Sequence, residues 1–178
     1  DDLIILYENI YKFHHDRIQE AAYSLIPENE KKRLHYLIGK NVLGKTLPQN
    51  LPDKLFYIVD QLNMGIDFVT NADEKLRLVG INLEAAQKAK NSTAYSSALR
   101  YARTGIKLLT DNSWRTNYRL TYTLYNEMLE CEYLTGEYDN AEKTFGIIIK
   151  NAKTGIDKAN VYSHMIILKQ STGDYGSA

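Results

Sequence analysis

Apolar residues recur every three or four positions along most of the chain, which is the spacing of one face of an α-helix. A clear example is the series Ala98, Ala102, Ile106 and Leu109. Turns rich in glycine and polar residues separate such segments. The pattern predicts helices capped by Asp16 and by Ser92 or Thr93, and further helices at about 27–44, 52–63, 72–90, 114–135, 138–153 and 157–171.

The first residues follow a different pattern. Leu3–Tyr7 is a short apolar run with β-branched residues, Glu8-Asn9 can turn the chain, and Tyr11–His14 alternates apolar with polar residues. This pattern predicts a β-hairpin, and a helix through residues 2–11 is the alternative. The next helix can be capped by Asp16, because a carboxylate accepts hydrogen bonds from the free N–H groups of a first turn.

A phrase near the end of the chain occurs twice. Gly136-Glu137-Tyr138-Asp139-Asn140-Ala141 returns 37 residues later as Gly173-Asp174-Tyr175-Gly176-Ser177-Ala178. A repeat of this length with helical spacing is typical of stacked helical hairpins. Each hairpin buries its apolar stripe against its neighbours, so we expect an all-α, α-solenoid fold behind the short N-terminal hairpin.

The first copy, with Phe145 after it, resembles a tetratricopeptide repeat. The resemblance implies that Gly136 and Tyr138 shape an inter-helix turn and that Ala141 and Phe145 pack against the preceding helix. Tyr95 and Ala98 resemble an earlier, weaker copy, and Gly173 and Tyr175 open the later one. Leu129, Ile148 and Lys153 depart from the family pattern, and the period of 37 exceeds the usual 34. No peptide-binding groove is therefore carried over.

Longer phrases resemble a second group of proteins. They are Tyr11–Ile26, Leu34-His35, Ile58–Gly65, Lys88–Tyr95 and Glu132–Gly136. Together these phrases resemble large bacterial signalling proteins that join a serine/threonine-kinase-like domain, an AAA/STAND ATPase and a sensor histidine kinase. The resemblance implies a region just after the ATPase core. Residues 1–26 would be the C-terminal end of a winged-helix-like subdomain, and residues 27–178 a tetratricopeptide-like region truncated at its C-terminus.

The resemblance also implies a nucleotide-sensing role for His15 and Asp16. In STAND ATPases a His-Asp pair closes the winged-helix part, and the histidine can touch the phosphate of bound ADP. The alternative is that Asp16 only caps a helix and that His15 is a surface or packing residue; both readings stay open. In either case the resemblance places ATP or ADP and Mg in the ATPase domain of the parent protein, with no cofactor in this fragment.

Composition excludes several classes of protein. The 22 basic and 22 acidic residues cancel, which argues against a nucleic-acid-coating protein. The single cysteine, Cys131, cannot form an internal disulfide and fits a reducing cytoplasm, and we expect it to serve packing. No apolar run approaches the length of a membrane span. No phosphate-binding loop and no zinc-ligand spacing occurs, so neither catalysis nor a metal site is expected.

Two further groups of side chains invite a functional reading. Tyr118, Tyr122 and Tyr125 form a helical stripe, which is expected to pack against the core and would otherwise line a ligand groove. The acidic cluster of Glu127, Glu130 and Glu132 is expected on a solvated helix face. Likewise, His35 is expected on a partly buried helix face and His164 on a solvated one.

These observations favour a non-catalytic regulatory and protein-interaction module that couples a nucleotide switch to kinase output. Its expected partners are the neighbouring ATPase and kinase domains, and a protein or peptide. We expect neither nucleic acid nor a membrane as a partner, and a cytoplasmic location. A winged-helix-associated transcriptional regulator that binds DNA is the alternative function. A small enzyme ranks last, because no constellation of acid, base and nucleophile can be drawn from these residues.

Overall fold

The computed structural model describes residues 4–7 and 10–172 of the 178-residue chain. Within these ranges the chain is α-helical, apart from a pair of short strands and two 3-10 turns. The chain divides into two compact units, residues 1–69 and residues 70–178. The boundary that the sequence predicts after residue 26 falls inside the first unit.

The first unit opens with two antiparallel strands, at the position where the alternating pattern predicts a hairpin. β1 (Ile4–Tyr7) pairs with β2 (Ile10–Phe13), and residues 8–9 lie outside the described part. α1 (Asp16–Ser24) follows, with His15 in extended conformation at the N-cap position and no side-chain cap. The prediction that Asp16 caps this helix is therefore wrong. Its carboxylate instead stands in the first turn, near the positive end of the helix dipole.

Two longer helices complete the first unit. α2 (Glu28–Lys45) starts directly after Pro27, and the turn η1 (Pro48–Asn50) leads into α3 (Leu51–Met64) and the turn η2 (Ile66–Phe68). Gly65, just after α3, lies close to the backbone of α2. A Cβ added there would stand 2.5 Å from the backbone nitrogen of Tyr36, so the contact requires glycine.

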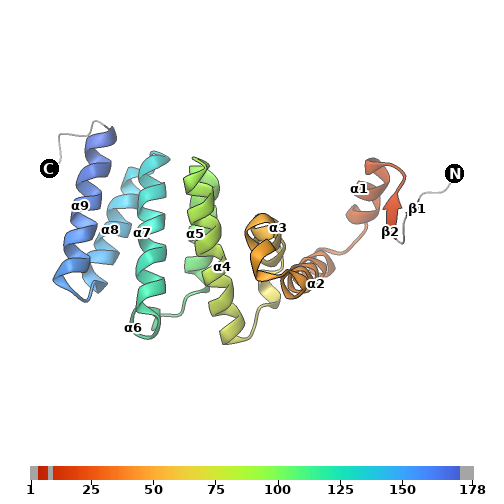
Figure 1. The fold of residues 1–178 in the computed structure, drawn as a ribbon, viewed down its shortest axis with the longest axis horizontal. Coiled ribbons are helices and arrows are strands. Elements are labelled where there is room, and N and C mark those ends of the chain that lie inside the picture. Colours follow the sequence, from red (N-terminus) through yellow and green to blue (C-terminus); the bar gives the residue numbers. More distant parts are fainter. Residues whose placement is uncertain (1–3, 8–9, 173–178) are drawn as a thin grey trace. The chain divides into compact units, whose positions relative to one another are not determined.

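The second unit is a row of helices that stand side by side in chain order (Figure 1). They are α4 (Ala72–Asn91), α5 (Tyr95–Leu108), the single-turn α6 (Ser113–Thr116), α7 (Tyr118–Leu134), α8 (Tyr138–Asn151) and α9 (Gly155–Thr172). Asn71 caps α4, because its Oδ1 accepts hydrogen bonds from the backbone N–H groups of Asp73 (2.8 Å) and Glu74 (3.1 Å). This arrangement is consistent with an α-solenoid-like fold.

The single helix predicted for residues 114–135 is interrupted in the structure. Asn117 leaves the helical conformation (φ −131°, ψ 46°) and separates α6 from α7. An asparagine side chain can hydrogen-bond nearby backbone groups in non-helical conformations, so asparagine favours helix ends over helix interiors. This preference explains the break. The ring of Trp114 on α6 then packs against those of Tyr118 and Tyr125 on α7, with centroids 6.1 and 5.1 Å away.

The turns after α4 and α7 have the same hydrogen bonds. Ala94 N–H donates to the carbonyl of Ala89 (2.9 Å), and 43 residues later Glu137 N–H donates to that of Glu132 (2.8 Å). Thr93 (φ 58°) and Gly136 (φ 79°) hold the left-handed conformation of this Schellman motif. The prediction that Ser92 or Thr93 caps α5 is thus wrong, because both belong to the end of α4 and Ala94 is the N-cap.

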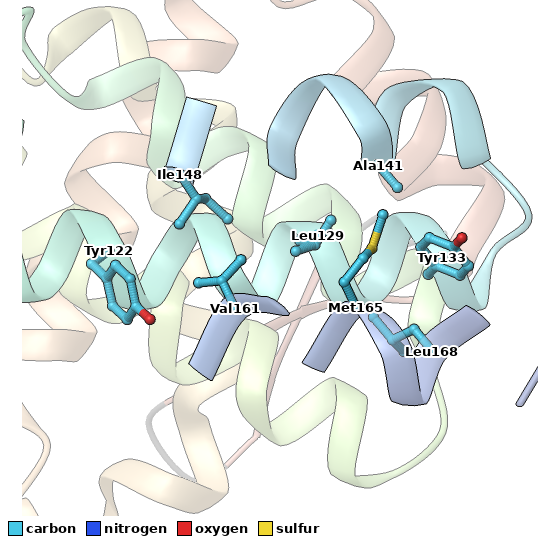
Figure 2. Packing of buried hydrophobic residues seen from close by; sticks show 8 residues of the cluster. All are labelled: Tyr122, Leu129, Tyr133, Ala141, Ile148, Val161, Met165 and Leu168. Carbon is cyan, nitrogen blue, oxygen red and sulfur yellow. The ribbon is translucent and has the colours of Figure 1, made fainter. Parts of the chain in front are cut away.

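A cluster of buried apolar side chains joins three helices of the second unit, as Figure 2 shows. α7 contributes Tyr122, Leu129 and Tyr133, which lie between residues of α8 and α9. Those neighbours are Ala141, Ile148, Val161, Met165 and Leu168. Side chains from three successive helices therefore bury one another, and this packing holds α7, α8 and α9 together.

Candidate functional site

Three side chains form a hydrogen-bonded triad in the first unit. His35 of α2 lies between Tyr23 of α1 and Gln61 of α3, with Nε2 at 2.7 Å from the tyrosine hydroxyl and Nδ1 at 2.7 Å from the glutamine Oε1. Because an amide oxygen only accepts, Nδ1–H donates to Gln61, and a neutral imidazole then accepts the tyrosine O–H at Nε2. The triad ties α1 to α2 and α3 through one imidazole.

The second unit carries a row of polar side chains that we name the polar ladder: Gln87, Lys90, Glu127, Glu130 and His164. Lys90 Nζ lies 2.8 Å from Glu127 Oε2 and 2.6 Å from Glu130 Oε2. Gln87 Nε2 donates to Glu127 Oε1 (3.2 Å), and His164 Nε2 lies 3.4 Å from Glu130 Oε2. The ladder therefore connects α4, α7 and α9.

One carboxylate of the ladder, that of Glu130, is held in its charged form. Hydrogen bonding to His164 lowers the pKa of Glu130 to about 2, against the opposing effect of burial and with further help from Lys90. Burial disfavours the ammonium of Lys90, but its bonds to Glu127 and Glu130 outweigh this and raise the pKa of Lys90. The side chains of Lys90 and Glu127 are only 18% and 12% exposed, so water screens this pair less than a surface ion pair.

A second network lies on another side of α7. Arg103 of α5 donates to Glu132 Oε1 (3.0 Å) and forms a two-point contact with Glu137, while Thr144 Oγ1 of α8 donates to Glu132 Oε2 (2.7 Å). The side chain of Glu132 is only 4% exposed. Its buried charge is therefore paired and hydrogen-bonded at both oxygens, which is the condition under which buried carboxylates are tolerated.

The prediction that the acidic cluster lies on a solvated helix face is wrong. Glu127, Glu130 and Glu132 are all largely buried and ion-paired. Residues two apart on a helix point about 200° away from each other, so Glu130 and Glu132 belong to different networks. His164 is likewise not on a solvated face, because it contacts Glu130 with its side chain one-third exposed. By contrast, His35 is partly buried, as predicted.

The three tyrosines of the predicted stripe all pack against the core cluster, and two of them also hold the start of α9. The hydroxyl of Tyr118 donates to Asp157 Oδ2 (2.8 Å), and that of Tyr122 to the carbonyl of Asp157 (2.9 Å). The bonds from Tyr118 and Thr154 lower the pKa of the Asp157 carboxyl. Tyr125 is partly buried beside Trp114. The stripe therefore packs against the core, and the hydroxyls of Tyr118 and Tyr122 are hydrogen-bonded.

The remaining predicted residues are placed as follows. His15 and Asp16 are exposed at the start of α1. Tyr95 and Tyr138 begin α5 and α8, Ala98 and Ala141 are buried on those helices, and Phe145 packs against the core cluster. Gly173 and Tyr175 lie outside the described residues. Sequence reasoning missed Tyr23, Gln61, Gln87 and Lys90, although two of the quoted phrases contain Tyr23 and Gln61 and a third contains Lys90.

Reactive groups are scarce in the described part of the chain. Burial raises the pKa of the Cys131 thiol to about 12, so it stays protonated at neutral pH. No group of three or more potential metal ligands is found among residues 4–7 and 10–172. Over the same residues, no helix combines the length and the apolarity that a membrane crossing requires.

The fold and these networks define a helical, α-solenoid-like chain whose polar contacts join neighbouring helices. Comparison with known proteins relates it to signalling proteins. Over 167 residues it is 29% identical to the hybrid signal transduction histidine kinase G of Dictyostelium discoideum, an alignment that covers 80% of this chain and 5% of that protein. No protein-family model and no solved structure matches. The organism of this relative lends no support to the bacterial origin that the sequence resemblance implies.

Proposed function

We propose that the chain is a non-catalytic regulatory and protein-interaction module of a signal-transduction ATPase and histidine kinase, which couples a nucleotide switch to kinase output. The alignment to a hybrid histidine kinase over four-fifths of the chain carries this proposal. Because the chain spans only 5% of that relative, the kinase and ATPase activities would belong to other parts of a parent protein.

The architecture supports this role. Two hairpins, α4–α5 and α7–α8, close with the same Schellman turn, as stacked repeats do, and we assign them to a tetratricopeptide-like array. The spacing of 43 residues between these turns exceeds the repeat of 37 by six. The linker before α7 accounts for this, since it has nine residues, including α6, against three before α9.

The triad of Tyr23, His35 and Gln61 gives the module a route for coupling. His15 and Asp16 are the N-cap and the first residue of α1, and both are exposed and thus accessible to a neighbouring ATPase domain and its bound ADP. A displacement of α1 moves Tyr23, and the bonded His35 transmits the displacement to α2 and α3.

We assign residues 1–26 to the end of a winged-helix-like subdomain, and the whole module to the cytoplasm.

The purified chain is expected to hydrolyse no ATP and to show no autophosphorylation. The physical reason is that it lacks a phosphate-binding loop. A phosphate-release assay and radiolabelled ATP measure the two activities, with a heat-denatured sample as control. ATP turnover that disappears in the Glu130→Gln variant would refute the non-catalytic assignment.

Coupling itself is tested in the full-length parent protein. Tyr23→Phe removes one hydroxyl of the triad and leaves the ring, so we expect nucleotide-dependent histidine phosphorylation to weaken several-fold while ATP hydrolysis is unchanged. Tyr57→Phe is the matched control, because Tyr57 is an exposed tyrosine on α3. Equal output from the two variants would contradict a route through the triad.

A further inference from the structure

The helix α2 has an uncovered apolar stripe. Leu34, Leu37 and Ile38 are 41%, 49% and 38% exposed, and their spacing places them on one side of the helix. The roughly opposite side is covered, because Gly39 is buried and leaves no room for a Cβ beside Leu62 of α3. Three large aliphatic side chains therefore face solvent together, whereas exposed apolar residues that need no explanation are scattered singly.

Polar residues continue this stripe toward both ends of α2. Glu30 precedes Leu34 by about one turn, and Asn41 and Lys45 follow on the same side. All three are exposed, and Glu30 keeps 52% of its side chain exposed beside a long 3.7 Å contact with Arg33 of the same helix. We name the full set the outer stripe of α2: Glu30, Leu34, Leu37, Ile38, Asn41 and Lys45.

The outer stripe of α2 is complementary to itself when two such helices run antiparallel. With the midpoint between Leu37 and Ile38 as the centre, Leu37 lies opposite Ile38 of the second copy. At each end Glu30 then lies opposite Lys45, and Leu34 lies opposite the uncharged Asn41. A parallel pairing would instead set Glu30 against Glu30 and Lys45 against Lys45, and like charges repel.

We infer that the outer stripe of α2 is a homodimer surface, on which α2 of a second copy of this chain packs antiparallel. The aliphatic centre excludes water, and the two pairs of Glu30 with Lys45 fix direction and register. A contact of one helix per chain lies at the small end of protein interfaces, so the dimer is expected to be weak. The inference goes beyond the proposed function, because it involves neither the nucleotide nor kinase output.

Sedimentation of the 178-residue chain at a series of concentrations tests the inference. We expect a monomer–dimer equilibrium, and Ile38→Asp should raise its Kd at least about ten-fold, because it places a charge at the apolar centre of the contact. Ile147→Asp on α8 is the matched control, since Ile38 and Ile147 are 38% and 39% exposed on different helices. Its Kd should equal that of the parent chain, and circular dichroism checks that both variants are folded.

Two outcomes of this experiment would overturn the inference. One is a dimer that Ile38→Asp does not weaken, because its interface would lie elsewhere. The other is a chain that is still monomeric at about 0.5 mM. That result would favour the competing occupant of the outer stripe of α2, a neighbouring part of a parent protein.

Charge reversal tests the antiparallel direction. Glu30→Lys and Lys45→Glu each set like charges opposite one another at both ends of the dimer, so each should raise the Kd about five-fold or more at low salt. An equimolar mixture of the two variants should form a heterodimer with about the Kd of the parent chain, since every positive end then meets a negative one. In a parallel dimer neither variant adds a repulsion, so two Kd values equal to that of the parent chain would overturn the antiparallel pairing.

Discussion

Glu130 is held between an ammonium group on one side and an imidazole on the other. Lys90 of α4 and His164 of α9 both contact its Oε2 atom, so this one side chain connects three helices. Its carboxyl has a pKa of about 2, well below the ordinary 4.5. A group whose pKa is depressed by folding stabilises the folded state above its unfolded pKa, and the stabilisation is lost as pH falls toward the folded pKa.

The low pKa of Glu130 therefore predicts that the free energy of unfolding falls as the pH is lowered from about 5 to about 2. Glu130→Gln should lower the free energy of unfolding at pH 7 by about 1–3 kcal/mol and should flatten its decline across that window, because the glutamine amide does not titrate. Urea unfolding at a series of pH values measures both effects. Glu84→Gln, an exposed position on α4, is the control and should change neither. A variant as acid-sensitive as the parent chain would exclude Glu130 as the titrating group.

At the scale of elements, the two Schellman turns show how the same backbone is built from different residues. Thr93 and Gly136 occupy the same position of the turn with positive φ values. Glycine accepts this conformation without cost, whereas a β-branched residue is strained in it. The first turn thus stores a local strain that the second does not.

Exchanges at the turns should shift stability in opposite directions. Thr93→Gly is expected to raise the free energy of unfolding by about 0.5–1 kcal/mol, and Gly136→Ala to lower it by about 1 kcal/mol. A Cβ at Gly136 meets no atom within 4 Å, so its effect comes from the backbone alone. Gly146→Ala inside α8 is the matched control and should stabilise by about 0.5–1 kcal/mol. Chemical denaturation measures all three, and a stabilising Gly136→Ala would contradict the turn geometry.

At the scale of the whole molecule, the chain divides into two compact units at Val69 and Thr70. The core cluster of α7, α8 and α9 is built from residues of the second unit alone, and so are the polar ladder and the Arg103 network. Trp114, the single tryptophan, also belongs to this unit and packs on Tyr118 and Tyr125.

Residues 70–178 are therefore expected to fold without the first unit. Their tryptophan emission maximum and their urea midpoint should match those of the full chain, because Trp114 reports only on contacts within this unit. Fluorescence-monitored unfolding of the two proteins makes the comparison. An emission maximum that is already at the unfolded position in residues 70–178 without denaturant would show that the unit depends on the rest of the chain.

The sequence by itself determined most of the helices, because each helix follows from local spacing of apolar residues and from turn residues close in the chain. It also determined the 37-residue relation between α7 and α9, seen in the buried pair Met128 and Met165. The sequence did not predict the break at Asn117 or the strained turn at Thr93. At both positions the local preference of the residue competes with the packing of the neighbouring helices. Only the tertiary structure decided the partners of Glu127, Glu130 and His35. Ion pairs and hydrogen bonds between residues tens of positions apart depend on which helix faces pack together. The spacing of residues along one helix does not determine which faces those are.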